Sequence, residues 1–205
     1  MVIQDANLKW AYRPDRMTRP VDFIVLHHAA AETASVEDVH RYHVSKGWAG
    51  IGYHYYIRRD GSIWRGRRPE EMGAHCPAVN SRSWGICFEG NFNSQQITTP
   101  QFVNGIQLVR QLKYLRPEAH VVPHKEIAST DCPGKLFPVS AFKNLEVVTM
   151  DSPSSWASEA CSWAVAAGLI TGDEHGDKHW HDPPTREELA VILKRFHDLI
   201  KGGDK

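Results

Sequence analysis

Continuous apolar runs and turn residues predict several strands along the first two thirds of the chain. Residues 21–29 (VDFIVLHHA) are almost uninterrupted apolar positions with several β-branched side chains, as in a strand buried on both faces. Residues 53–59 and 62–66 flank an Asp-Gly pair and predict a hairpin with a two-residue turn. Shorter strands are expected at residues 83–89 and 119–122, the second of which leads into a histidine.

Two helices are expected between these strands. Ser35 and Asp38 form a capping-box-like start for a helix over residues 35–47. A Thr-Pro pair opens a second helix over residues 99–115. Its apolar stripe comprises Phe102, Val103, Ile106, Val109 and Leu112.

The mixed order of strands and helices predicts an α/β domain over residues 1–147, with a mixed central sheet flanked by helices. A linker is expected around residues 144–153, followed by a small all-α unit over residues 154–205. The first helix of that unit carries an apolar stripe, and Thr185 with Glu188 caps the last helix. The stripe comprises Trp156, Ala160, Trp163, Ala164 and Ala167.

Composition and charge narrow the function classes. The formal net charge is zero, which gives no reason to expect nucleic acid or a membrane as a partner. No apolar run is long enough for a secretory signal or a membrane span, so we expect synthesis in the cytoplasm without an anchor. The four cysteines include no CxxC pair, and a Cys76–Cys87 bridge is conceivable. The seven tryptophans pack in the core or stack on sugars.

A metal site is indicated by a histidine and a cysteine eight residues apart. His124 and Cys132 lie at a strand end and in the following loop, where both can reach one ion. A hydrolytic zinc site needs a third protein ligand and an open position for water. The third ligand is His27 or His28, because side chains alternate across a strand and only one of the two can face the site. A buried histidine bonded to a backbone carbonyl is the alternative for each.

The chain resembles the type-2 N-acetylmuramoyl-L-alanine amidases, a family shared by phage endolysins and peptidoglycan recognition proteins. The resemblance rests on FIVLHHAAA, GWAGIGYHYYIRRDGSIWRGR, GAHCPAVNSRSWGICFEGNF, the TTPQ helix start and VVPHKEIASTDCPG, in the family's order and spacing. It implies the recognition-protein-like α/β fold and Zn²⁺ as the cofactor. The implied zinc ligands are His27, His124 and Cys132, with His28 as the variable neighbour.

The same resemblance implies roles around the metal. Tyr53 matches the active-site tyrosine, and Thr130 falls where some members carry lysine and others threonine. His75 and Asn80 resemble groove residues that contact the muramyl peptide, although an asparagine in a turn commonly bonds the local backbone. Glu126 orients a ligand or is a solvated surface carboxylate.

The implied activity is hydrolysis of the amide bond between the N-acetylmuramic acid lactyl group and L-alanine of peptidoglycan, as in a phage or prophage endolysin released through a holin-type pore. The alternatives are a non-catalytic peptidoglycan-binding protein and a cytoplasmic amidase that recycles muropeptides. The last 50 or so residues resemble one S-layer-homology repeat, a module that binds secondary cell-wall polymer. We expect this segment to target walls, or to stabilise or oligomerise the chain.

Overall fold

The protein has two compact units, Met1–Leu145 and Glu146–Lys205, each described by itself below. The predicted linker and both predicted domain boundaries, at residues 147 and 154, lie mainly or wholly outside the described residues. The computed structural model describes residues 2–145, 157–171, 178 and 184–202.

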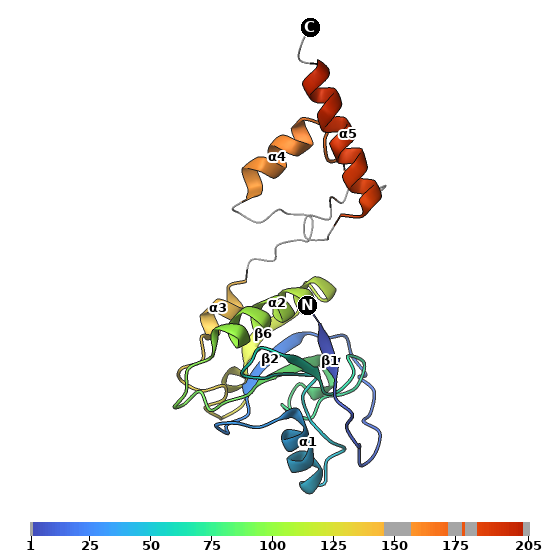
Figure 1. Cartoon of the computed structure of the whole chain (residues 1–205). Coiled ribbons are helices and arrows are strands. Elements are labelled where there is room, and N and C mark those ends of the chain that lie inside the picture. The colour runs from blue at the N-terminus through green and yellow to red at the C-terminus, as the bar shows by residue number, and fades with distance from the viewer. Residues whose placement is uncertain (1, 146–156, 172–177, 179–183, 203–205) are drawn as a thin grey trace. The chain divides into compact units, whose positions relative to one another are not determined.

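The first unit is built on one six-stranded mixed sheet (Figure 1). The strand order is β1-β4-β3-β5-β2-β6; β3 and β4 are antiparallel, and every other neighbouring pair is parallel. The predicted α/β class with a mixed sheet is therefore confirmed. The strands are β1 (Ile3–Asp5), β2 (Phe23–His28), β3 (Tyr55–Ile57), β4 (Ile63–Arg65), β5 (Ser83–Phe88) and β6 (His120–Pro123).

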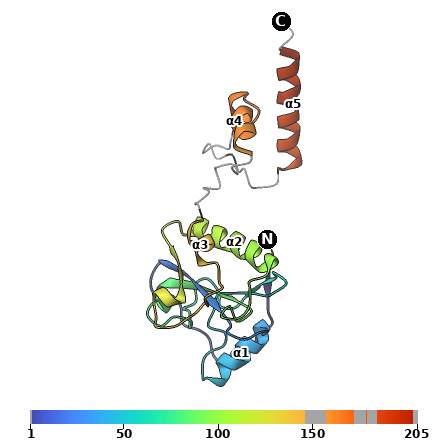
Figure 2. The ribbon, with the colours of Figure 1, turned by 90° about the vertical axis from the view of Figure 1, so that its left-hand side faces the viewer.

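Helices cover both faces of the sheet. Helix α1 (Val36–Ser45) lies on one face, and α2 (Thr99–Leu115) and α3 (Val139–Lys143) lie on the other in both views (Figures 1 and 2). Both long helices begin with a reciprocal capping box, at Ser35 and at Thr98. Two single 3-10 turns, at Asn80–Arg82 and His124–Glu126, precede β5 and follow β6.

The core explains why β2 and β5 read as continuous apolar runs. All six residues of β5 are buried, as are five of the six in β2, because helices cover both faces of these central strands. The buried face of α2 is displaced from the predicted stripe: Val103 is 45% exposed, and Gly105 lies inward. A Cβ at Gly105 would approach the Phe88 ring to 2.7 Å, so the helix packs closely on β5 at this point.

The hairpin between β3 and β4 has a longer loop than predicted. Arg58 and Ser62 pair through the backbone, which leaves three residues in the loop instead of two. Gly61 has a φ of +87° and takes the left-handed position that such a loop requires. Asp60 accepts hydrogen bonds from the backbone and the hydroxyl of Ser62 and closes the turn.

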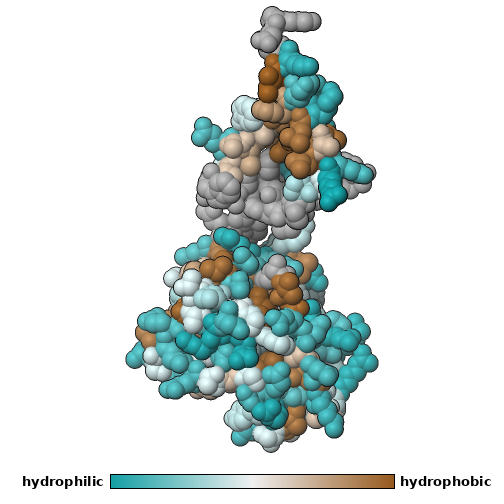
Figure 3. Space-filling view, in the orientation of Figure 1, coloured by the Kyte–Doolittle hydropathy of each residue, from teal (hydrophilic) through white to brown (hydrophobic). Residues whose placement is uncertain are grey.

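The described residues of the second unit include the helices α4 (Ser158–Ala166) and α5 (Arg186–Gly202). The predicted cap is confirmed, since Thr185 and Glu188 exchange backbone and side-chain hydrogen bonds. Trp163 is 54% exposed, so the predicted apolar stripe of α4 is not buried at this position. Brown apolar side chains gather on this unit in Figure 3, and Leu189, Leu193 and Phe196 of α5 are exposed. Within the described part of the chain, no helix combines the length and the apolar character needed to cross a membrane.

Candidate metal centre

Two parallel strands deliver the two histidines of the candidate site. The β2–β6 register pairs Leu26 with Pro123, so the next residues, His27 and His124, emerge at the same level of the sheet. Their ring centroids lie 4.5 Å apart. The ligand atoms of His27, His124 and Cys132 all lie within 4.8 Å of one another. The structure thus brings together the three residues that the sequence predicted as zinc ligands.

The loop after β6 returns Cys132 to the strand ends. The Lys125 backbone N–H donates to the Cys132 carbonyl at 2.9 Å, and the Cys132 N–H donates to Thr130 Oγ1 at 3.2 Å. The backbone N–H of His28 donates to Cys132 Sγ at 3.4 Å, and His27 Nδ1 lies 3.7 Å from the same sulfur. These contacts hold the sulfur beside Nδ1 of His27.

The environment leaves the imidazoles neutral. Burial, with the neighbouring His75 and His124, holds the pKa of His27 well below its usual range, and burial lowers the pKa of His124. Neutral rings offer lone pairs to a metal at physiological pH. Burial raises the pKa of the Cys132 thiol to about 11, so the thiolate needs a cation beside it. Two imidazoles and a thiolate around one point fit zinc, which takes such donors with a fourth position open.

His28 has a structural role on the other side of β2. Its Nδ1 accepts a hydrogen bond from the Phe92 backbone N–H at 3.1 Å, and its ring stacks on Phe92 at 6.0 Å. The alternation of side chains along β2 therefore directs His27 to the cluster and His28 away from it.

Tyr53 lies two residues before β3, with its ring 5.1 Å from that of His27. Burial raises the pKa of Tyr53 well above its usual range, and the neighbouring Cys87 and Cys132 thiols raise it further. The phenol therefore stays protonated and can donate a hydrogen bond. Cys87 is a free thiol, as is Cys76, so the conceivable bridge between them is absent. No sequence motif marked Cys87 as a neighbour of the site.

The predicted ligand-orienting role of Glu126 has no structural support. Glu126 and Lys143 are both exposed and form an ion pair at 2.9 Å on the surface. No contact between Glu126 and a predicted ligand is found among the described residues. The alternative of a solvated surface carboxylate applies instead. Thr130 is also exposed, and its hydroxyl contacts the ligand loop through the backbone of Cys132.

His75 and Asn80 lie behind the ligands. His75 is 8% exposed, and its Nδ1 lies 3.0 Å from Nε2 of His27. The Asn80 side-chain oxygen accepts hydrogen bonds from the backbone N–H groups of His75 and Cys76, at 2.9 and 2.8 Å. These bonds match the local backbone role that was the alternative for Asn80. The predicted contact of both residues with a muramyl peptide stays a prediction.

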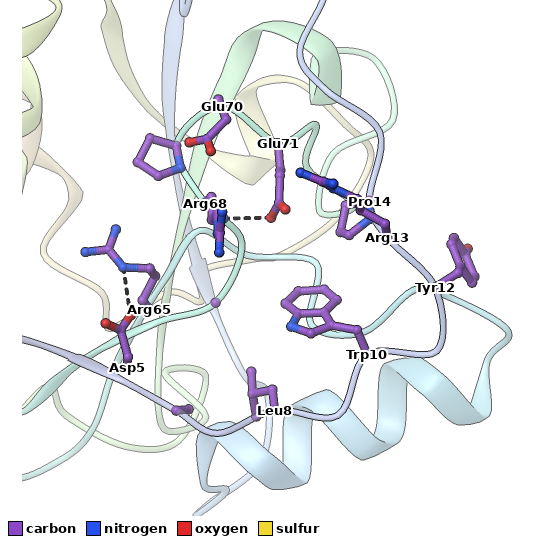
Figure 4. Close-up of a pocket in the computed structure, with 13 residues that line it drawn as sticks. Asp5, Leu8, Trp10, Tyr12, Arg13, Pro14, Arg65, Arg68, Glu70 and Glu71 are labelled. Atoms are coloured by element: carbon purple, nitrogen blue, oxygen red, sulfur yellow. Dashed lines mark hydrogen bonds and ion pairs between the residues drawn. The ribbon is translucent and has the colours of Figure 1, made fainter.

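A separate groove of about 1030 Å³ lies between the N-terminal segment and residues 65–71 (Figure 4). Trp10 and Tyr12 lie along one side of it, and Arg68 and Glu71 along the other. None of the predicted ligands lines this groove, and neither does Tyr53. Its size alone assigns it no part in the chemistry of the cluster.

The protein therefore has an α/β fold that carries a His–His–Cys cluster of the kind that zinc hydrolases use to hold their metal. The chain belongs to the N-acetylmuramoyl-L-alanine amidase family, whose model matches residues 17–135. The matched segment contains all three candidate ligands and Tyr53, and it ends before the C-terminal unit.

Similar proteins come from phages, bacteria and animals. The endolysin of Enterobacteria phage K11 is 31% identical over 134 residues, which cover 60% of this chain and 87% of the endolysin. The peptidoglycan-recognition protein SC2 of Drosophila melanogaster is 33% identical, over 56% of this chain and 68% of its own. The solved structure of the N-acetylmuramoyl-L-alanine amidase LysC from Clostridium intestinale has a TM-score of 0.67 and 37% identity, covering 71% of this chain and 99% of LysC.

Proposed function

We propose that this protein is a zinc-dependent amidase that cleaves peptidoglycan between the lactyl group of N-acetylmuramic acid and L-alanine of the stem peptide. The observation that carries the proposal is the convergence of His27, His124 and Cys132 within 4.8 Å in a member of the amidase family. The similarity to phage endolysins favours a lytic enzyme of a phage or prophage. Such an enzyme reaches the wall through a holin-type pore or on lysis.

Bound zinc supplies a Lewis acid that polarises a carbonyl and makes water acidic enough to attack near neutral pH. The protein's own residues prepare that site. His27 and His124 present neutral rings, and the Cys132 thiolate offsets one unit of the metal's charge. Zn²⁺ with one thiolate and two neutral imidazoles would keep a net positive charge, and this remaining charge would stabilise the anionic species that forms during amide hydrolysis.

Tyr53 is the proposed hydrogen-bond donor to the reacting groups. Its raised pKa keeps the proton on the phenol, and its ring lies 5.1 Å from His27. One donor aimed at developing negative charge is worth a few kcal/mol of transition-state stabilisation. Thr130 brings a hydroxyl and no charge to the position where some relatives carry lysine, and its Oγ1 already accepts from the Cys132 N–H. We therefore assign Thr130 to holding the ligand loop, with Tyr53 as the principal donor.

A non-catalytic peptidoglycan-binding protein is the second candidate, supported by the similarity to recognition proteins. The cysteine in the cluster favours the enzyme, because a binding protein has no need of a thiolate that is costly to bury without a metal. We further propose that the C-terminal unit, with its S-layer-homology-like sequence, contacts secondary cell-wall polymer. A muropeptide-recycling amidase would have no use for such a unit.

Mass spectrometry of digested peptidoglycan tests the bond specificity. We expect new L-alanine amino termini and no new reducing sugars, together with close to one zinc per purified chain. New reducing ends would identify a glycosidase and contradict the proposal. Binding to sacculi without any new termini would leave the recognition-protein function in its place.

A further inference from the structure

A line of buried hydrogen bonds runs from the ligand His27 into the core. Nε2 of His27 lies 3.0 Å from Nδ1 of His75, and Nε2 of His75 lies 3.3 Å from Ser83 Oγ. The Ser83 hydroxyl in turn bonds the Val79 carbonyl at 2.8 Å. His27, His75 and Ser83 are each less than 10% exposed, so water does not compete for these bonds.

The proton positions along this line of hydrogen bonds follow from its last acceptor, the Val79 carbonyl. A carbonyl oxygen can only accept, so the single hydroxyl proton of Ser83 points to Val79, and Ser83 Oγ must accept from Nε2–H of His75. The His75 ring is buried and carries its one proton on Nε2, so its Nδ1 is an acceptor. His27 must then carry its proton on Nε2, which leaves the lone pair on Nδ1.

That lone pair points to the metal position. Nδ1 of His27 is the nitrogen that lies 3.7 Å from Cys132 Sγ, on the side of the ligand cluster. In the opposite tautomer, Nδ1 would carry a proton where the metal must bind. We propose that His75 is a positioning residue that commits His27 to its metal-binding tautomer, with its own proton held by Ser83. This inference rests on the proposed zinc site and assigns His75 a role that needs no contact with substrate.

The surroundings of His75 are shaped around its ring. A Cβ at Gly73 or at Gly85 would approach ring atoms of His75 to 2.6 Å, so glycine at both positions makes room for the imidazole. Asn80 holds the His75 backbone through its side-chain oxygen. The backbone bond and the space beside the two glycines thus favour the ring orientation that reaches His27, as expected for a group that orients a metal ligand.

The first test compares zinc affinity among full-length variants by chelator competition. His75→Leu removes the acceptor for His27 Nε2–H and should weaken zinc binding about 10- to 100-fold. His75→Asn places an amide oxygen near the position of Nδ1 and should restore most of the affinity. The matched control is His40→Leu, because His40 is also buried with both ring nitrogens bonded and contacts none of the ligands. It should bind zinc as the wild type does, although its thermal stability falls.

The second test reads the tautomers directly, by long-range proton–nitrogen NMR on metal-free wild-type protein labelled at histidine. We expect protons on Nε2 of both His27 and His75. A proton on Nδ1 of His27, or wild-type zinc affinity in His75→Leu, would overturn the inference. The spectra are recorded on wild-type protein, so they test the inference even if the His75→Leu variant fails to fold. A wild-type protein that shows these tautomers but binds no zinc would contradict the proposed function alone.

Discussion

Acidification below about pH 6.5 should destabilise the first unit, because several histidines are buried in the neutral form. His54 and His43 show this most directly. Burial lowers the pKa of each from 6.5 to about 4. His54 accepts from the Gly85 N–H and contacts the Glu71 carbonyl, and His43 accepts from the Gly52 N–H. Protonation would remove both acceptor sites and place a charge in the core.

The direction and size of this change in stability follow from the numbers of protons bound by the folded and unfolded chains. The unfolded chain takes up protons near pH 6.5 and the folded chain only near pH 4, so stability is complete above about pH 6.5 and is lost as the pH falls towards about 4. The gap in pKa corresponds to about 3 kcal/mol for each residue. These two residues contribute about 2.7 kcal/mol per pH unit to the slope inside this window, and the other buried histidines add to it. The total is comparable with the stability of a whole domain, about 5–15 kcal/mol.

Urea unfolding at a series of pH values measures this slope. A chelator must be present throughout, because acid also releases metal from histidine and cysteine ligands. Burial raises the pKa of Glu89, but hydrogen bonds from Arg58 and from backbone donors lower it more, so Glu89 adds to the loss of stability only at the acid end of the series. The matched variant is His43→Asn, which keeps an acceptor for the Gly52 N–H and removes the titrating ring. It should reduce the slope by about 1.4 kcal/mol per pH unit, the contribution of one titrating group. A free energy of unfolding that is flat between about pH 6.5 and about pH 4.5 would refute the reasoning.

Three further predictions concern the site and the second unit. Cys132→Ser should lose zinc and most hydrolysis, because a hydroxyl is a weak neutral ligand. The control Cys161→Ser, in α4, should keep both zinc and hydrolysis, and metal analysis of the two variants tests this prediction. Tyr53→Phe should keep zinc and lower kcat about 10²-fold, and full activity would remove Tyr53 from the chemistry. Truncation after Thr149 should preserve zinc binding and hydrolysis of soluble muropeptides. If the second unit contacts the wall, the truncated protein should bind sacculi more weakly. If that unit only stabilises the chain, sacculus binding should persist and only Tm should fall.

Local patterns predicted most of the fold because its main elements are specified locally. The capping residues Ser35 and Thr185 mark helix starts whatever the tertiary context. Strand β2 is visible in the sequence as a continuous run of apolar residues. Strand β1 was not predicted, because its three residues have no periodicity and are held by pairing with β4. The displaced face of α2 has a similar cause, since the contact of Gly105 with Phe88 depends on tertiary packing.

The sequence predicted which residues form the candidate site, but it did not predict the hydrogen bonds between them. His124 and Cys132 are close in sequence, and the resemblance supplied His27 and Tyr53. The partner of His27 could not be inferred, because the bond to His75 spans 48 residues and depends on how two segments pack. Glu126 shows the opposite error: it is near His124 in sequence but pairs with Lys143 on the surface.

The arrangement of the candidate ligands explains how a partly buried polar cluster can persist in this fold. Two of the three ligands leave adjacent hydrogen-bonded strands at one level, so the sheet itself sets their spacing. The third is held by backbone bonds of its own loop and by the His28 N–H. Polar atoms behind His27 are paired through His75 to the backbone carbonyl of Val79. Because the fold fixes the positions of these side chains, we expect the proposed site to bind metal without ordering the chain, unlike small zinc modules that fold only on binding.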